Sequence, residues 1–113
     1  MRSIKELQAM VHSLALEKGW HADRDLTNPH HLASMLALIH TEVSEATECV
    51  RVGEVDLFVG VTGKPTGLPS ELADIIIRVL DMSGALGIDM GELIEQKHAY
   101  NQTRPYRHGN KRL

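Results

Sequence analysis

The stretch LPSELADIIIRVLD, residues 68–81, decides the fold of this chain. It opens with proline, serine and glutamate, as the N-terminus of a helix often does, and the run that follows is almost entirely apolar. Acids interrupt that run at helical spacing, at Glu71, Asp74 and Asp81. A helix that is apolar nearly all round is usually buried, and buried acids are costly unless they are paired or bind a metal. The stretch therefore predicts a buried helix that carries a metal site.

Length and composition limit the class of protein. A chain of 113 residues forms one domain with a small core, and its few aromatic residues favour aliphatic helix packing over a β-sandwich. The single cysteine, Cys49, excludes an internal disulfide framework and a cysteine-based zinc site, and it is typical of a reducing compartment. No apolar run reaches transmembrane length and no signal peptide opens the chain, so we expect a cytoplasmic protein without a membrane partner.

Four segments combine helical periodicity with capping residues at their ends, so we expect an all-α fold resembling a four-helix bundle. These segments are Ser3–Lys18, Pro29–Val52, Pro69–Leu86 and Asp89–Gln102. The connection Gly53–Leu68 is predicted to be a loop, with a short strand-like excursion at Val55–Val61. Residues 103–113 are predicted to form an irregular basic tail of the same single domain, 1–113.

The second predicted helix carries two glutamates, Glu42 and Glu45, on the flank of its main apolar stripe. That stripe consists of Leu32, Leu36, Ile39, Val43, Ala46 and Val50. If the second and third helices pack antiparallel, the two glutamates lie opposite Glu71 and Asp74. Four carboxylates without histidine or cysteine favour Mg²⁺ or Mn²⁺ over zinc or copper, and Mg²⁺ is usually completed by substrate phosphates. Arg78 can neutralise only one acid, and a structural ion pair is the alternative, above all for Asp81.

The fourth predicted helix carries polar groups where apolar ones would pack better. Lys97 and Asn101 lie in the middle of its apolar face, and Arg104 follows one turn later. A lysine at a helix end can extend its amine to solvent, but a cation and an amide in line also suit phosphate. Residues 42–95 carry a net charge of −8, whereas residues 97–113 carry +5 and no acid. This asymmetry suits a site for a metal-bound polyphosphate, although a solvated surface can have it too.

Three motifs together resemble the MazG-type all-α nucleoside triphosphate pyrophosphohydrolases. They are EVSE at 42–45, ELAD at 71–74 after a gap of 25 residues, and KHAYNQTR at 97–104, within a resemblance that covers roughly residues 28–113. The resemblance implies cleavage of a nucleoside triphosphate between its α and β phosphates, which gives a monophosphate and pyrophosphate. It further implies Mg²⁺ as the cofactor, with Mn²⁺ possible, and assembly as a homodimer or homotetramer.

The resemblance also assigns roles to residues. The metal ligands would be Glu42, Glu45, Glu71 and Asp74, and the contacts to phosphate or sugar would be Lys97, Asn101 and Arg104. We expect Glu45 to combine metal binding with acceptance of a proton from the attacking water, since it lies farther from the core stripe than Glu42. Lys97 is the second residue expected to act in catalysis.

The residues that contact the base do not follow from the resemblance, because the segment LTNPHH at 26–31 departs from the family pattern. Trp20 and His31 are the candidates for this part of substrate binding, together with His21 and His30. We expect the nucleotide and further copies of this chain as partners, and no nucleic-acid polymer.

Two alternative functions remain open from the residues alone, and a third lacks the motif that it needs. Hydrolysis of phosphoribosyl-ATP is a reaction of the same superfamily. A non-enzymatic helical oligomerisation module would use the acids as interface ion pairs. A di-iron carboxylate protein would need two Glu-x-x-His pairs, whereas the chain contains one candidate, Glu95 and His98.

Overall fold

The computed structural model describes residues 1–113 and is built mainly from helices. The elements are, in chain order, α1 (Ile4–Glu17), α2 (Pro29–Val52), β1 (Phe58–Val59), β2 (Pro65–Thr66), α3 (Leu68–Ala85), α4 (Met90–Gln102) and α5 (Arg107–Asn110). The predicted all-α class is confirmed, and the four long helices begin and end within about one residue of the bounds predicted from the sequence. None of these helices combines the length and apolar character that a membrane span needs.

Local capping explains why the helix bounds follow from the sequence. The Ser3 hydroxyl accepts a hydrogen bond from the Glu6 amide, and the Glu6 carboxylate accepts one from the Ser3 amide, which forms a capping box at the start of α1. Asn28 caps α2, and Gly53 ends that helix in the left-handed region at φ +81°. The Asp89 carboxylate caps α4 by accepting from the Glu92 amide.

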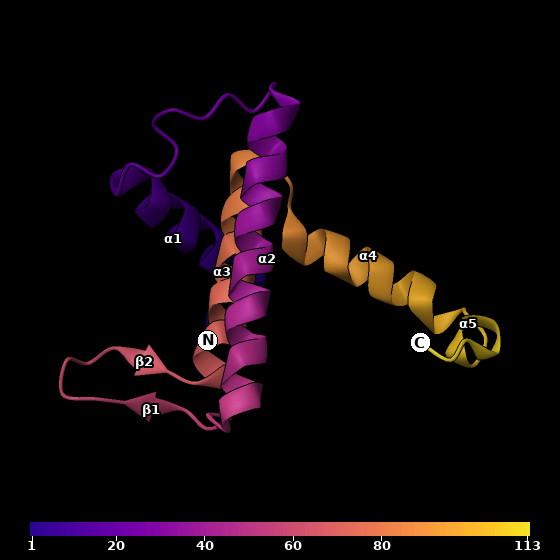
Figure 1. The fold of residues 1–113 in the computed structure, drawn as a ribbon. Helices are drawn as coiled ribbons and strands as arrows, with labels where there is room; N and C mark the ends of the chain where they lie inside the picture. The colour runs from indigo at the N-terminus through magenta and orange to yellow at the C-terminus, as the bar shows by residue number, and fades with distance from the viewer.

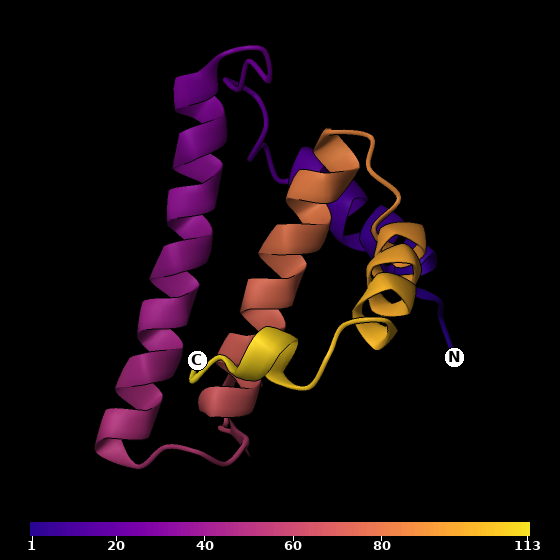
Figure 2. The same cartoon turned by 90° about the vertical axis from the view of Figure 1, so that its right-hand side faces the viewer.

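Helix α3 occupies the centre of the molecule, with α1 and α2 packed on different sides of it. Figure 2 shows α3 standing between α2 and the pair formed by α1 and α4. Helix α4 packs mainly on α1 and extends away from the α2–α3 pair (Figure 1). The four helices therefore do not close into a bundle within one chain, which corrects the bundle-like subunit expected from the sequence.

A short β-ribbon projects from the end of the α2–α3 pair (Figure 1). Phe58 of β1 pairs with Thr66 of β2 in antiparallel register, so the strand-like excursion predicted between residues 55 and 61 is present. Gly67 closes the base of the ribbon at φ +96°, where an added Cβ would collide with the Asp56 carbonyl oxygen. The ribbon therefore joins α3 at a position that only glycine can occupy.

The core of the single chain is small. Its buried apolar residues are Met35, Ala46, Cys49 and Leu80. Leu36, Val43 and Val50 of the predicted α2 stripe are 51%, 43% and 57% exposed, because α3 packs instead on the neighbouring face of α2. The complete burial predicted for α3 is also wrong for one chain, since Leu72 and Ile76 are 51% and 56% exposed.

The size of the molecule agrees with this open packing. Its radius of gyration is 16.6 Å, whereas a compact domain of this length would have about 13 Å. Apolar faces on α2, α3 and α4 are left without a covering element.

Candidate functional site

Three glutamates converge between α2 and α3. Glu42 and Glu45 lie one helical turn apart on α2, and Glu71 faces them from the first turn of α3. Carboxylate oxygens of these three residues all lie within 4.8 Å of one another. Asp74 lies outside this group of three and lines the adjoining pocket. The structure therefore brings together three of the four predicted metal ligands and leaves the fourth at their side.

The cluster is only partly neutralised by protein groups. Arg78 donates a hydrogen bond from Nε to Glu42 Oε1 at 2.8 Å, so the arginine pairs with an acid of α2 rather than with Asp81. The second oxygen of Glu42 and the Oε2 atom of Glu71 are buried and have no hydrogen-bond partner. Buried carboxylate oxygens without a partner are rare in proteins because desolvation is then uncompensated. These two oxygens would be satisfied by a bound cation.

The electrostatics of Glu71 agree with an uncompensated site. Burial raises the pKa of this carboxyl group above its usual value, and hydrogen bonding and charge repulsion from Glu45 raise it further, followed by the charges of Asp74 and Glu42. A divalent cation would reverse this by favouring the ionised form. The cluster offers only hard oxygen donors, which fit Mg²⁺ or Mn²⁺ and not a thiolate-binding metal.

Cys49 lies near the cluster without adding a donor to it. Its side chain is buried, and this burial raises the pKa of the thiol, with smaller contributions from the charges of Glu71, Glu54 and Glu45. A thiol held in its neutral form is a poor metal ligand, since the thiolate is the binding species. The cysteine therefore does not change the metal preference of the oxygen cluster.

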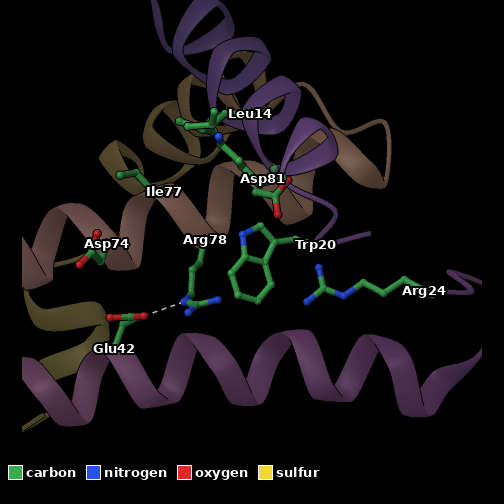
Figure 3. Close-up of a pocket in the computed structure, with 11 residues that line it drawn as sticks. Leu14, Trp20, Arg24, Glu42, Asp74, Ile77, Arg78 and Asp81 are labelled. Atoms are coloured by element: carbon green, nitrogen blue, oxygen red, sulfur yellow. Dashed lines mark hydrogen bonds and ion pairs between the residues drawn. The ribbon is translucent and has the colours of Figure 1, made fainter. Parts of the chain in front are cut away.

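A pocket of about 310 Å³ adjoins the cluster, and residues of α3 line one side of it. Its walls come from α1, from α2 and from the loop between them. Its polar lining consists of Lys18, Arg24, Glu42, Asp74, Arg78 and Asp81, and Trp20 adds an indole ring. Figure 3 shows Glu42 and Asp74 at one end, with Arg78 between this acidic end and the Trp20 indole. Arg24 lies on the far side of the indole. The pocket thus joins an acidic end to an aromatic end.

Asp81 lies beside the aromatic end and is held by two imidazoles. His12 of α1 lies 2.8 Å from Asp81 Oδ1 through Nδ1, and His21 of the α1–α2 loop lies 2.9 Å from Oδ1 and 3.0 Å from Oδ2 through Nε2. His12 reaches α3 because Gly84 has no side chain, since an added Cβ would lie 2.9 Å from His12 Cβ and Cγ. This trio joins α1, the α1–α2 loop and α3.

The predicted phosphate-binding residues lie away from the acidic cluster. Lys97 and Asn101 line a separate groove of about 320 Å³ on α4, together with Met90, Leu93 and Ile94, which confirms that they share an apolar face. Arg104 follows the end of α4 and, like Lys97 and Asn101, is exposed. None of the three lines the pocket beside the glutamates. Within one chain the two predicted parts of the site are therefore not brought together.

Two of the four candidates for base contact, Trp20 and His31, are placed differently. Trp20 lines the pocket and is 65% exposed. His31 does not line the pocket, and its Nδ1 accepts a hydrogen bond of 2.7 Å from the Asp25 amide in the loop before α2. No role was predicted for His12, which follows Val11 on α1 and belongs to no motif in the sequence.

No protein-family model, no curated protein and no solved structure matches this chain. The proposals that follow therefore depend on the geometry of the site.

Proposed function

We propose that the protein is a metal-dependent nucleoside triphosphate pyrophosphohydrolase, which releases a nucleoside monophosphate and pyrophosphate. The observation that carries the proposal is the cluster of Glu42, Glu45 and Glu71, with two buried oxygens that lack any protein partner. Glu42 also lines the pocket of about 310 Å³, so a ligand in the pocket can extend to the cluster. The motifs that resemble the MazG-type family support the same reaction.

The chain's own residues suggest how the reaction would run. A Mg²⁺ ion bound by the three glutamates and Asp74 would neutralise phosphate charge and acidify a bound water. Glu45 is the exposed member of the cluster, so it would orient the attacking water and accept its proton. The water oxygen then forms a bond to phosphorus, the α–β phosphoanhydride bond breaks, and pyrophosphate leaves. Arg78 lies between the acidic end and Trp20, where it would balance charge on the phosphates.

The proposed site also needs a second copy of the chain. Lys97, Asn101 and Arg104 lie on or after α4, which buries no residue within the subunit. The exposed apolar faces of α2 and α3 give an oligomer surface to bury, and the basic segment 97–113 complements the acidic segment 42–95. We propose a dimer or tetramer in which α4 of one copy approaches the acidic cluster of another. A stable folded monomer in sedimentation at micromolar concentration would contradict this assembly.

A product assay tests the proposed reaction. Purified protein is incubated with each nucleoside triphosphate and Mg²⁺, and pyrophosphate and orthophosphate are measured separately. We expect pyrophosphate and monophosphate in equal amounts, loss of turnover in excess chelator, and recovery with Mn²⁺. Release of orthophosphate, or full activity in chelator, would contradict the proposal.

Two alternatives have their own outcomes in this assay. Turnover of phosphoribosyl-ATP in preference to every nucleoside triphosphate would assign the related activity of the superfamily. A well-folded oligomer that hydrolyses none of these substrates would support an oligomerisation module, for which the acids serve the interface alone.

A further inference from the structure

The carboxylate of Asp81 is a fixed hydrogen-bond acceptor at the wall of the pocket. Its side chain is 15% exposed, and Figure 3 shows it directed toward the Trp20 indole. His12 and His21 hold it from two different elements, so the orientation of the carboxylate does not depend on α3 alone. Neither the acidic cluster nor the proposed hydrolysis uses this arrangement.

The hydrogen bonds show that the Asp81 carboxylate acts as an acceptor. Arg24 Nη1 lies 3.4 Å from His21 Nδ1, and since a guanidinium can only donate, this ring nitrogen accepts. The proton of a neutral His21 is then on Nε2, which donates to Asp81. In this arrangement Nε2 of His21 holds the proton that Asp81 accepts, so the trio is a hydrogen-bonded carboxylate.

One acceptor position of this carboxylate stays open. Oδ1 accepts from His12 and from His21, whereas Oδ2 shares only the His21 proton at 3.0 Å. A carboxylate has about four acceptor positions. Oδ2 can therefore accept a further hydrogen bond from a group in the pocket.

The surroundings of Oδ2 suit a flat heterocycle. The Trp20 indole gives the pocket an aromatic face, and Val11, Leu14 and Ile77 give it apolar walls. Stacking on an aromatic face binds any base, so the indole supplies affinity without choosing among bases. A buried polar group that needs a hydrogen bond from the ligand can discriminate among bases.

We propose that Asp81 selects the base of the substrate by accepting a hydrogen bond from an exocyclic amino group. Cytosine and adenine carry such a group, whereas uracil and hypoxanthine present a carbonyl oxygen at the same position, which would face the carboxylate as a second acceptor. The inference rests on the proposed function for the identity of the ligand as a nucleotide. Trp20 stacks the base, Asp81 reads it, and His12 is a positioning residue for Asp81.

Fluorescence of the single tryptophan tests this inference without any turnover. Trp20 is the only tryptophan in the chain and lines the pocket, so a stacked base will quench it. The probes are cytidine and uridine 5′-monophosphates, which differ at the 4-amino or 4-oxo group, and adenosine and inosine 5′-monophosphates as a second pair. We expect the amino-bearing member of each pair to bind at least about tenfold more tightly.

Four variants assign the preference to Asp81. Asp81→Asn replaces one acceptor by a donor, so the preference for the amino-bearing base should disappear or reverse. Asp23→Asn makes the same change at an exposed aspartate of the α1–α2 loop and should leave the preference intact. His12→Leu should weaken the preference, whereas His12→Asn, whose amide nitrogen can replace Nδ1, should keep most of it.

The outcomes separate this inference from the proposed function. Equal affinity for cytidine and uridine monophosphates in the unchanged protein, or quenching by neither, overturns the role of Asp81, and neither result needs a variant to fold. Absence of pyrophosphate release from every triphosphate overturns the hydrolysis alone. If the amino preference and its loss in Asp81→Asn survive that absence, the pocket binds nucleotides without cleaving them.

Discussion

The α2–α3 pair and helix α4 carry the two halves of the proposed site, and the two halves differ in how far they are buried. The acidic half is assembled within the subunit, with Glu42 only 8% exposed and paired to Arg78. The basic half lies on α4, which buries none of its residues. Three carboxylates can be held together only by surrounding structure, because they repel one another, whereas separate cations need no such support. In the proposed site, a ligand or another copy would supply the neutralising charge.

Removal of one acid should have the largest effect on this comparison. Glu71→Gln removes a proposed metal ligand with little change in shape, so kcat/KM for pyrophosphate release should fall roughly a hundredfold or more. Glu48→Gln is the matched control, since Glu48 is exposed on α2, lies outside the cluster and pairs with Arg51 at 2.8 Å. Steady-state kinetics in saturating Mg²⁺ measure both. Equal losses in the two variants would show that the cluster is not the site.

Removal of the cation from α4 should have a smaller effect. Lys97→Met keeps the apolar stem of the side chain and removes its charge, so the melting temperature should hold or rise. The value of kcat/KM should fall at least about tenfold, equivalent to about 1.4 kcal/mol of transition-state stabilisation. An unfolded variant whose folded fraction keeps full activity would instead make the lysine structural.

Mixing the two impaired variants shows whether the halves meet across chains. Consider a mixed dimer of Glu71→Gln with Lys97→Met in which each site takes its acids from one chain and its α4 from the other. One of its two sites then contains both substitutions, and the other contains neither. Random exchange of subunits would then restore roughly a quarter of the normal number of intact sites. The measurement is pyrophosphate release after subunit exchange, compared with each variant alone. Absence of any recovery, with exchange verified by mass, would show that α4 serves the cluster of its own chain.

The pH dependence of unfolding gives the smallest expected effect. The pKa of Glu71 is raised in the folded chain above its usual value of 4.5, so folding binds this proton more tightly than the unfolded state does. The contribution of Glu71 to stability is complete at pH values below its pKa in the unfolded chain. This contribution is lost as the pH rises through its pKa in the folded chain. The melting temperature of metal-free protein should therefore fall as the pH rises above the usual pKa of a glutamate.

Two comparisons isolate Glu71 in this experiment. Glu71→Gln removes this contribution and leaves every other ionisable group in place, so the difference between the two pH profiles belongs to Glu71. Mg²⁺ should flatten the profile, because binding favours the ionised cluster. Asp25 does not interfere, since the Thr27 hydroxyl and amide lower the pKa of its carboxyl group and its contribution changes only in more acidic solution. Identical profiles for the two proteins would contradict the shift.

Local signals in the sequence predict the helices and part of the site. Ser3, Asn28 and Asp89 are caps whose partners lie two or three residues away, so their effect does not depend on the rest of the fold. The spacing of Glu42 and Glu45 fixes their common side of α2, and the loop before α3 makes Glu71 a neighbour. These features follow from distances along the chain.

The features that escaped prediction depend on packing between distant segments. Periodicity identifies two apolar surfaces on α2 but not which one faces α3, and the surface with Val43 is the one left exposed. The partners of Asp81 come from α1 and the α1–α2 loop, and His12 is 69 residues away from it. No pattern within one helix reports such a contact.

The central place of α3 has a consequence for the order of folding. Arg78 and Glu42 join α3 to α2 across 36 residues of chain, whereas the His12–Asp81 contact closes a loop nearly twice as long. The shorter closure costs less chain entropy, so the α2–α3 hairpin should form first and α1 should dock onto it afterwards. Amide hydrogens of α1 should accordingly exchange with solvent faster than those in the middle of α3. Each transient detachment of α1 would break the His12–Asp81 contact while the acidic cluster stays assembled. The proposed selectivity for the base would therefore be lost before the proposed metal site.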